Sequence, residues 1–375
     1  MIDLQELRKE IDRIDKEIVS LFEERMEICK NVAEYKIETG KKVFDKERED
    51  QKIEAVKAMT GNEINRQGAG ELFGQIMSIS RKLQYKLLAE HGILEELPFQ
   101  SVDTLEKEKA KVVFQGIEGS YSHAAMKTYF GENVNSFHVK TFRNAMEAIA
   151  KGEADYAVLP IENSTAGIVS EIYDLLVEFD NYIVGEQIIE IKQCLLGVPG
   201  STKEDIQVVY SHPQSLMQSA GYLRTQDWKQ ISMENNAFAA KKVADERDKK
   251  QAAIAGRHAG ELYGLTILEE GINDNEMNST RFIIVSSKKI FMKSAEKVSI
   301  CFEIPHESGS LYKTLSHFIY NGINLCSIES RPIKGKNWEY RFFVDFEGNL
   351  KDDAVKNVLR SLQEETQNMT VLGNY

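Results

Sequence analysis

LQELRKEIDRIDKEIVSLFEERMEICKNVAEYK, residues 4–36, places apolar side chains at alternating steps of three and four, the spacing of one long amphipathic helix. The repeated positions are Leu4, Leu7, Ile11, Ile14, Ile18, Leu21, Ile28, Val32 and Tyr35. At position 25, where the repeat calls for an apolar residue, the chain has arginine. Because an unpaired buried guanidinium is costly, we expect Arg25 to bind an anion.

Two more helical segments follow. One is predicted from about Lys46 to Met59, and the next has an apolar stripe of its own. That stripe consists of Leu72, Ile76, Ile79, Leu83 and Leu87. Residues 1–90 are therefore expected to form an all-helical domain. Since one long arm and two shorter helices can hardly close a core alone, antiparallel or intertwined dimerisation is expected.

Helix geometry groups some polar residues of this domain and separates others. Lys36 lies about three turns after Arg25 and so projects from nearly the same face. Arg8 lies ~25 Å from Arg25 along the axis. If one small molecule binds both arginines, Arg8 must come from a second subunit. On the third helix Ser80 and Gln84, one turn apart, offer neutral hydrogen-bonding groups.

Residues 1–90 resemble the all-helical chorismate mutase family. The matching text is LRKEIDRIDKEIVSLFEERMEI (7–28), AEYK (33–36), VFDKEREDQ (43–51) and SRKLQ (80–84). Taken singly, most of the charged residues in it would be solvated side chains on helix faces, but the complete set favours the mutase. The rearrangement of chorismate is pericyclic, so a site of hydrogen-bond donors suffices and no cofactor or metal is expected.

The resemblance implies a role for each polar group of this site. Arg25 and the partner subunit's Arg8 would hold the two carboxylates of chorismate, with Arg48 as a helper. The remaining contacts would be Lys36 and Gln84 to the ether oxygen, and Asp45, Glu49 and Ser80 to the ring hydroxyl and nearby groups.

The pattern changes after a charged, aperiodic stretch at residues 91–110, which is typical of a linker. In residues 111–288 short β-rich runs alternate with helical stretches such as 142–150 and 238–245, which predicts an α/β domain with a largely parallel sheet. The expected strands are Val112–Phe114, Tyr156–Leu159, Cys194–Val198, Val208–Tyr210, Ala252–Ala255 and Phe282–Val285.

Several loops of this α/β domain join a strand end to polar residues. GIEGSYSHAA (116–125) alone indicates only a tight turn with Ser120 or Ser122 as a helix cap. Three further motifs are LPIENSTAG (159–167) with Asn163, Ser164 and Thr165, NSTRFIIV (278–285) with Thr280 and Arg281, and YSHPQ (210–214) with Ser211, His212 and Gln214. Open α/β sheets bind ligands at the carboxyl ends of their strands, so these loops are expected to converge on one cleft.

Together these motifs resemble the prephenate dehydratases. The resemblance implies a bilobed fold similar to type 2 periplasmic binding proteins, with prephenate between the lobes. Thr280 would assist departure of the hydroxyl by hydrogen-bond donation, because threonine is a poor acid at neutral pH. Arg281 and the loop 163–165 would anchor the carboxylates and the hydroxyl, and Ser211 and Gln214 would also bind substrate. We expect His212 to have a structural role.

Residues 296–375 follow a strand, helix, strand, strand, helix, strand order, which fits an α+β ferredoxin-like domain. PHESGSLYKTL (305–315) and NLCSIESRPI (324–333) resemble the two phenylalanine-binding motifs of the ACT domains attached to prephenate dehydratases, with Ser310 where alanine is usual. The resemblance implies a regulatory phenylalanine site at Gly309, Leu311, Glu329, Ser330 and Arg331. Taken singly, Gly309 would be a helix-start turn.

Composition limits the other possibilities. The net charge of −12 argues against nucleic acid or an anionic membrane as the main partner, and no apolar signal-peptide core or membrane-spanning run is present, so a cytoplasmic location is expected. The four cysteines, Cys29, Cys194, Cys301 and Cys326, lack metal-binding spacing and are expected to be reduced core residues.

Two other functions remain open at this point. The α/β and C-terminal domains could form a pure binding module, although the complete set of site residues argues against it. A dehydrogenase would need a GxGxxG turn, which is absent from the α/β sequence. The sequence thus predicts an enzyme that converts chorismate to prephenate and prephenate to phenylpyruvate, is inhibited by phenylalanine, and forms a homodimer or a larger homo-oligomer.

Overall fold

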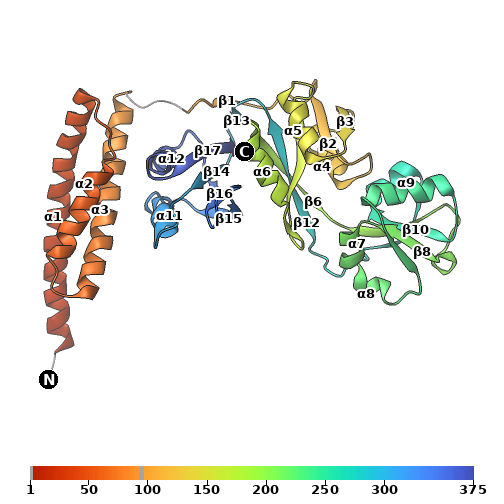
Figure 1. Ribbon diagram of the computed structural model, residues 1–375, viewed down its shortest axis with the longest axis horizontal. Coiled ribbons are helices and arrows are strands. Elements are labelled where there is room, and N and C mark those ends of the chain that lie inside the picture. Colours follow the sequence, from red (N-terminus) through yellow and green to blue (C-terminus); the bar gives the residue numbers. More distant parts are fainter. Residues whose placement is uncertain (1–2, 93–96) are drawn as a thin grey trace. The chain divides into compact units, whose positions relative to one another are not determined.

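The computed structural model describes residues 3–92 and 97–375 (Figure 1). The chain divides into two compact units. The first unit contains the N-terminal helices together with Phe302–Cys326 and Phe346–Met369, and the second contains Pro98–Cys301, Ser327–Asp345 and Thr370–Tyr375. The helices of the first unit are α1 (Leu4–Thr39), α2 (Lys46–Ala58), α3 (Glu63–Glu90), α11 (Ser310–Tyr320) and α12 (Asp353–Glu365). The three N-terminal helices are confirmed.

Helix α1 has clear start and stop signals. The Asp3 side chain caps its start by accepting from the Gln5 amide at 2.9 Å, and Gly40 ends it with a left-handed φ of 68°. Ala33 of α1 packs in a small core with Val43, Tyr85 and Leu88. The apolar stripe of α1 nevertheless stays exposed in the single chain; Leu21, for example, is 65% exposed.

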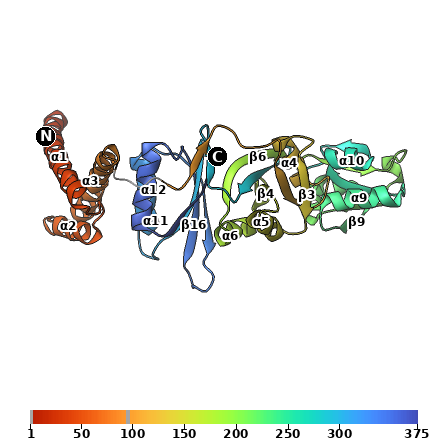
Figure 2. The same cartoon turned by 90° about the horizontal axis from the view of Figure 1, so that it is seen from above.

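The second unit has two lobes joined by long strands. The elements of the first lobe are β2 (Lys111–Gln115), α4 (Tyr121–Phe130), β3 (Asn135–Val139), α5 (Phe142–Ala150), β4 (Tyr156–Asn163), β5 (Gly167–Ile168), α6 (Ser170–Glu178), β6 (Tyr182–Glu190) and β12 (Ser279–Ser286). Helices α5 and α6 cover one face of the sheet and α4 covers the other (Figure 2). Each face therefore has its own apolar core.

The second lobe is built on a separate sheet with the strand order β11-β7-β10-β8-β9. Its elements are β7 (Gln193–Gly197), η1 (Lys203–Asp205), β8 (Val208–Ser211), α7 (Pro213–Gln218), α8 (Ala220–Leu223), β9 (Lys229–Ser232), α9 (Asn236–Glu246), β10 (Gln251–Gly256), α10 (Arg257–Tyr263) and β11 (Thr266–Glu270). The chain enters this lobe after β6 and returns to the first lobe at β12, so the two lobes meet where the predicted site residues lie.

The expectation of a largely parallel sheet is only partly right. Strand β2 is parallel to β3 and β4, and β8 is parallel to β9 and β10. In contrast, β12 is antiparallel to β4 and β6, and β7 is antiparallel to β10 and β11. The reason is topological: a chain that leaves one lobe along β6 must return along β12 in the opposite direction.

Part of the expected linker 91–110 belongs to the second unit. Residues 93–96 lie outside the described residues. Strand β1 (Gln100–Val102) is parallel to β13 (Ile290–Met292), and Leu105 and Ala110 are buried in the core beside α4. The sequence pattern did not predict this strand or the buried residues after it, because a short strand with scattered apolar residues carries no periodic signal.

The expected strands of the C-terminal domain are β14 (Lys297–Glu303), β15 (Leu325–Pro332), β16 (Tyr340–Glu347) and β17 (Gln367–Asn374). They continue the sheet of the first lobe in the order β15-β16-β14-β17-β6. Cys326 is exposed, which corrects its assignment to the core; it lies on the exposed face of the outermost strand β15, whereas the other three cysteines are buried. Among the described residues, no helix is long and apolar enough to cross a membrane.

Candidate active sites

Lys36 of α1 and Gln84 of α3 meet, although 48 positions separate them in the sequence. The Lys36 ammonium donates to Gln84 Oε1 at 2.9 Å and to the Val43 carbonyl at 2.7 Å. The Gln84 amide donates in turn to Ser80 Oγ at 3.2 Å, and both Ser80 and Gln84 are 5% exposed. These predicted site residues therefore form one polar group inside the helical domain.

The electrostatics of Lys36 place two more predicted residues close by. Burial lowers the pKa of Lys36, and the charges of Asp45 and Glu49 oppose that shift. Asp45 caps α2 by accepting from the Arg48 amide at 3.1 Å, while the Arg48 side chain is exposed. Carboxylates at the start of α2 therefore lie near the Lys36 ammonium.

Two predicted arginines stand apart from this group. Arg25 is half-buried, and its guanidinium lies 3.8 Å from Cys29 Sγ. Arg8 is exposed near the other end of α1, ~25 Å from Arg25 along one unbroken helix. A single chain therefore does not bring Arg8 and Arg25 to one small molecule.

Arg81 is a buried residue that the sequence reasoning did not select. Its side chain, 7% exposed, forms ion pairs with Glu49 and, at 2.8 Å, with Glu365 of α12, and it lies over the Phe44 ring at 5.1 Å. Burial alone would lower the pKa of Arg81, but Glu365 and Glu49 raise it. Arg81 immediately follows Ser80 in SRKLQ, so the motif contained it without indicating its role.

In the second unit, Asn163 and Thr280 lie opposite each other on β4 and β12. The Asn163 amide donates to Thr280 Oγ1 at 2.9 Å and to Asn278 Oδ1 at 2.8 Å. Asn163 Oδ1 accepts from the Thr165 hydroxyl at 2.8 Å. A hydroxyl that accepts from an amide keeps its own proton to donate, so the Thr280 proton is left available for another acceptor.

The other residues of the loop 163–165 hold the strand ends together and reach the second lobe. Ser164 Oγ accepts from the Ser279 amide at 3.0 Å, which ties the loop to β12. Thr165 Oγ1 accepts from Gln218 of α7 at 2.8 Å. This contact between the lobes makes Gln218 a further candidate site residue. The sequence analysis did not select Gln218, which lies one helical turn after the predicted Gln214.

The residues of the motif YSHPQ (210–214) form hydrogen bonds mainly within their own lobe. Ser211 is fully buried and donates to the Ile254 carbonyl at 2.6 Å. His212 Nδ1 accepts from the Gln214 amide at 3.2 Å and caps α7, which agrees with a structural role. Asn236 Oδ1 lies 3.2 Å from Ser211 Oγ and accepts from the His212 amide at 3.2 Å, so it connects α9 to this loop.

Arg281 does not join the group around Thr280. Its side chain is 13% exposed, and its guanidinium lies among carboxylates, 3.0 Å from Asp345, 3.4 Å from Glu162 and 3.6 Å from Glu186. Adjacent strand residues point to opposite faces of a sheet, which explains why Thr280 and Arg281 separate.

The predicted phenylalanine residues lie in both units. In the first unit Gly309 starts α11 with a left-handed φ of 82°, and Leu311 is half-buried. In the second unit Glu329 is half-buried and Ser330 is exposed. Arg331 forms a bidentate pair with Asp174 of α6, at 2.8 and 3.2 Å.

Comparison with known proteins covers both enzymatic domains. Residues 7–85 match the family model "Chorismate mutase type II", and residues 112–290 match "Prephenate dehydratase". A "Bifunctional chorismate mutase/prephenate dehydratase" of Aquifex aeolicus is 34% identical over 379 residues, which cover 100% of this chain and 98% of that protein. The chain belongs to this bifunctional family. It is an enzyme of phenylalanine biosynthesis with a mutase domain followed by a dehydratase domain.

Two solved structures resemble the dehydratase part of this bifunctional enzyme. The prephenate dehydratase of Arthrobacter aurescens in complex with L-Phe is 28% identical with a TM-score of 0.66, over 71% of this chain and 89% of that one. A quorum-quenching acylase, GqqA, has the same TM-score at 30% identity, over 71% of this chain and 97% of that one. The fold of this part therefore does not decide the reaction, whereas the full-length match of both domains does.

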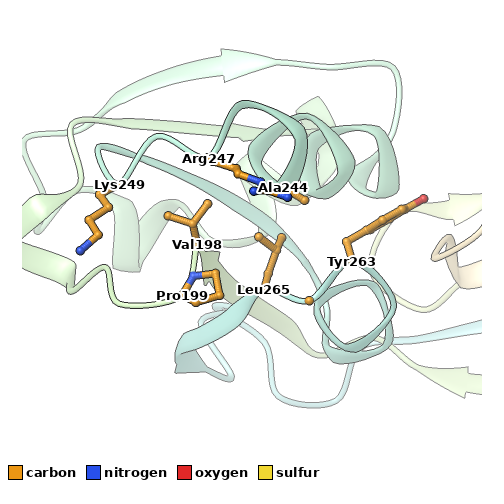
Figure 3. A pocket seen from close by; sticks show the side chains of 8 residues that line it. Val198, Pro199, Ala244, Arg247, Lys249, Tyr263 and Leu265 are labelled. Carbon is orange, nitrogen blue, oxygen red and sulfur yellow. The ribbon is translucent and has the colours of Figure 1, made fainter.

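Two hollows in the dehydratase domain differ in their relation to its site residues. One of about 330 Å³ lies in the second lobe, between Pro199, Arg247 and Tyr263, and none of the predicted substrate residues lines it (Figure 3). A second, of about 170 Å³, is lined from both lobes by Tyr121, Ile189 and His258. None of the predicted substrate residues lines this smaller hollow either, but its Ile189 pairs with Thr280 across β6 and β12.

Proposed function

We propose that this bifunctional enzyme rearranges chorismate to prephenate at α1–α3, converts prephenate to phenylpyruvate between the lobes of the second unit, and is inhibited by phenylalanine. Two contacts carry the proposal: Lys36 with Gln84, and Asn163 with Thr280. Each joins residues far apart in sequence that the family resemblances assign to one site. Incubation of the purified chain with chorismate, followed by detection of prephenate and phenylpyruvate, tests it.

In the mutase, the ammonium of Lys36 has three protons, and the structure directs two of them to protein acceptors. The third is available for the ether oxygen of chorismate, on which negative charge develops. Gln84 is the second donor, and Ser80 holds its amide in place. Asp45, Glu49 and Ser80 position the ring hydroxyl, and Arg48 assists the carboxylate-binding arginines. Preorganised donors of this kind stabilise the transition state without a proton shuttle.

Arg25 and the partner subunit's Arg8 would hold the two carboxylates of chorismate. The exposed apolar stripe of α1 supports dimerisation, because Leu7, Ile18 and Leu21 are each about half exposed or more in one chain. A second copy of the same helix would cover this stripe and carry Arg8 toward Arg25. A cytoplasmic homodimer or larger homo-oligomer is the form we propose.

Mixing an Arg8→Ala chain with an Arg25→Ala chain is expected to restore mutase activity that neither variant has alone. In each mixed dimer one of the two sites regains both arginines, so random reassociation of equal amounts of the two chains should make about a quarter of all sites active. The measurement is chorismate turnover after the chains are unfolded together and refolded. Mixed dimers proven by differently tagged chains that show no recovery would contradict the shared site.

In the dehydratase, loss of carbon dioxide and hydroxide from prephenate needs a donor to the leaving hydroxyl. Thr280 fills that role because Asn163 occupies one of its lone pairs and leaves its proton free to donate. Thr165 and Ser164 belong to the same loop as Asn163, and Gln218 reaches this loop from the second lobe. We propose that this loop and Gln218 bind prephenate together with Ser211 and Gln214. The two lobes joined by β6 and β12 support a fold similar to type 2 periplasmic binding proteins.

The C-terminal region would be an ACT domain with a ferredoxin-like fold, and it would bind phenylalanine. The strand order β15-β16-β14-β17, with α11 and α12 between strands in the chain, supports that fold. The L-Phe complex of the Arthrobacter dehydratase supports the ligand. Gly309, Leu311, Glu329, Ser330 and Arg331 would form the binding site.

Gly309→Ala is expected to weaken phenylalanine binding about tenfold or more, because the motif needs the left-handed backbone at Gly309. Gly335→Ala is a matched control: both glycines have nearly the same φ, 82° and 81°, and an added Cβ meets nothing within 4 Å at either. Both substitutions therefore impose the same local strain of ~1–2 kcal/mol. Calorimetric titration with phenylalanine compares the two variants, and equal affinities would exclude Gly309 from the site.

A further inference from the structure

Arg281 is part of a buried polar network that extends from the dehydratase strand β12 into the C-terminal strands. Its guanidinium donates to Asp345 of β16 at 3.0 Å and lies 3.4 Å from the hydroxyl of Tyr375, which follows β17. Ser299 of β14 donates to the other oxygen of Asp345 and lies 3.0 Å from the same tyrosine hydroxyl. The Asp345, Ser299 and Tyr375 residues are each 8% exposed or less.

The charges around Arg281 leave it little capacity for a substrate carboxylate. Asp345, Glu186 and Glu162 lie around its guanidinium, and within the described part of the chain the one further cation paired with these carboxylates is Lys297, which binds Glu186 at 2.7 Å. A bound carboxylate would add a fourth negative charge to two positive ones. Burial alone would lower the pKa of Arg281, but Tyr375 and Asp345 raise it, so the guanidinium stays charged beside these partners.

The backbone beside Arg281 is also irregular. In the pairing of β12 with β4 the register shifts between Arg281 and Phe282: Arg281 pairs with Glu162 and Phe282 with Pro160, so the extra residue of this bulge belongs to β4. A bulge bends a strand and re-aims the neighbouring side chains, and bulges are frequent next to active sites. Asn163, which donates to Thr280 from the same part of β4, therefore depends on how the bulged β4 and the Arg281 end of β12 are held together.

We propose that Arg281 is a positioning residue that holds the Thr280 end of β12 against the C-terminal strands and transmits a change in those strands to the dehydratase site. Asp345 and Ser299 are its partners in this role. The inference rests on the proposed phenylalanine regulation for the signal, and on the geometry of β12 for the positioning. This positioning role replaces the role expected from the sequence, in which Arg281 binds a carboxylate of prephenate.

Point variants of the full-length chain test this better than a deletion of the C-terminal domain. Gly373 of β17 pairs with Ile183 of β6, so a deletion would uncover an edge of the dehydratase sheet. Asp345→Asn keeps the shape of the side chain and removes its charge. Ser299→Ala is a milder second variant in case the first folds poorly. Arg143→Met, which breaks the exposed pair of Arg143 with Glu178 in the same lobe, is the control.

In Asp345→Asn and Ser299→Ala we expect KM for prephenate to stay within about twofold of wild type while kcat falls. The phenylalanine concentration for half-inhibition should rise at least ~10-fold, although calorimetry still detects phenylalanine binding. Arg281→Lys, which keeps the charge, should retain more of the inhibition than Arg281→Met. The control should match wild type in every measurement.

Two results would overturn the proposal. One is a KM for prephenate at least ~10-fold higher in Arg281→Lys with normal kcat, because that is the signature of a lost substrate anchor. The other is unchanged kcat and unchanged inhibition in both Asp345→Asn and Ser299→Ala. Failure of the wild-type enzyme to bind phenylalanine would instead contradict the proposed sensor, and the ratio of kcat to KM effects would still decide whether Arg281 positions Thr280.

Discussion

Lys36→Ala is expected to lower mutase kcat/KM by about 10²- to 10³-fold, the typical cost of removing one preorganised donor from a developing oxyanion. The loss should fall mainly on kcat, since the donor acts most strongly on charge that develops in the transition state. Dehydratase activity on added prephenate should be unchanged, because Thr280 and Asn163 belong to the other unit. Separate assays of chorismate and prephenate consumption measure both reactions.

The control for this variant is Lys30→Ala, which removes an exposed lysine of the same helix that pairs with Glu27. A second check uses pH. Lys36 donates only when protonated, and burial lowers its pKa, so mutase activity should fall as pH rises and should do so at lower pH than for an ordinary lysine. If Lys36→Ala and Lys30→Ala had the same mutase activity, the assignment of Lys36 would be wrong.

Thr280→Ala is expected to reduce dehydratase kcat by about 10²- to 10³-fold and to leave the mutase intact. The substitution removes the hydroxyl that accepts from Asn163 and that we propose donates to the leaving group. Thr280→Ser keeps a hydroxyl at the same position and should retain most of the activity. Phenylpyruvate formation from prephenate, followed with saturating substrate, is the measurement.

Asn163→Ala tests the positioning of Thr280 that we propose for the Asn163 amide. Without the amide, Thr280 can rotate and its proton is no longer directed, so kcat should fall even though the hydroxyl is present. Full activity of Thr280→Ala in a folded enzyme would refute the proposed role of the hydroxyl. Loss of both reactions in Thr280→Ala would refute the independence of the two sites.

Local patterns were enough to predict much of this fold. The three- and four-residue spacing from Leu4 to Tyr35 predicted α1, because helix periodicity depends only on neighbouring residues and on which face is apolar. Short β-rich runs placed β4 and β12 in the same way. The position of Arg25 within an apolar stripe, and of Thr280 at a strand mouth, likewise drew attention to these residues before any contact was known.

Sequence patterns were thus sufficient for the long helices, for several strands and for a list of candidate polar residues, but not for the short strand β1 or for the antiparallel strands. Tertiary structure alone decided which partners those residues have. Arg281 adjoins Thr280 in sequence, yet strand alternation and the carboxylate of Asp345 turn it away; Gln218 was found only because α7 meets the loop at Thr165. The reason is physical: periodicity records which face of an element is buried, whereas ion pairs and hydrogen bonds depend on segments that pack together from distant parts of the chain.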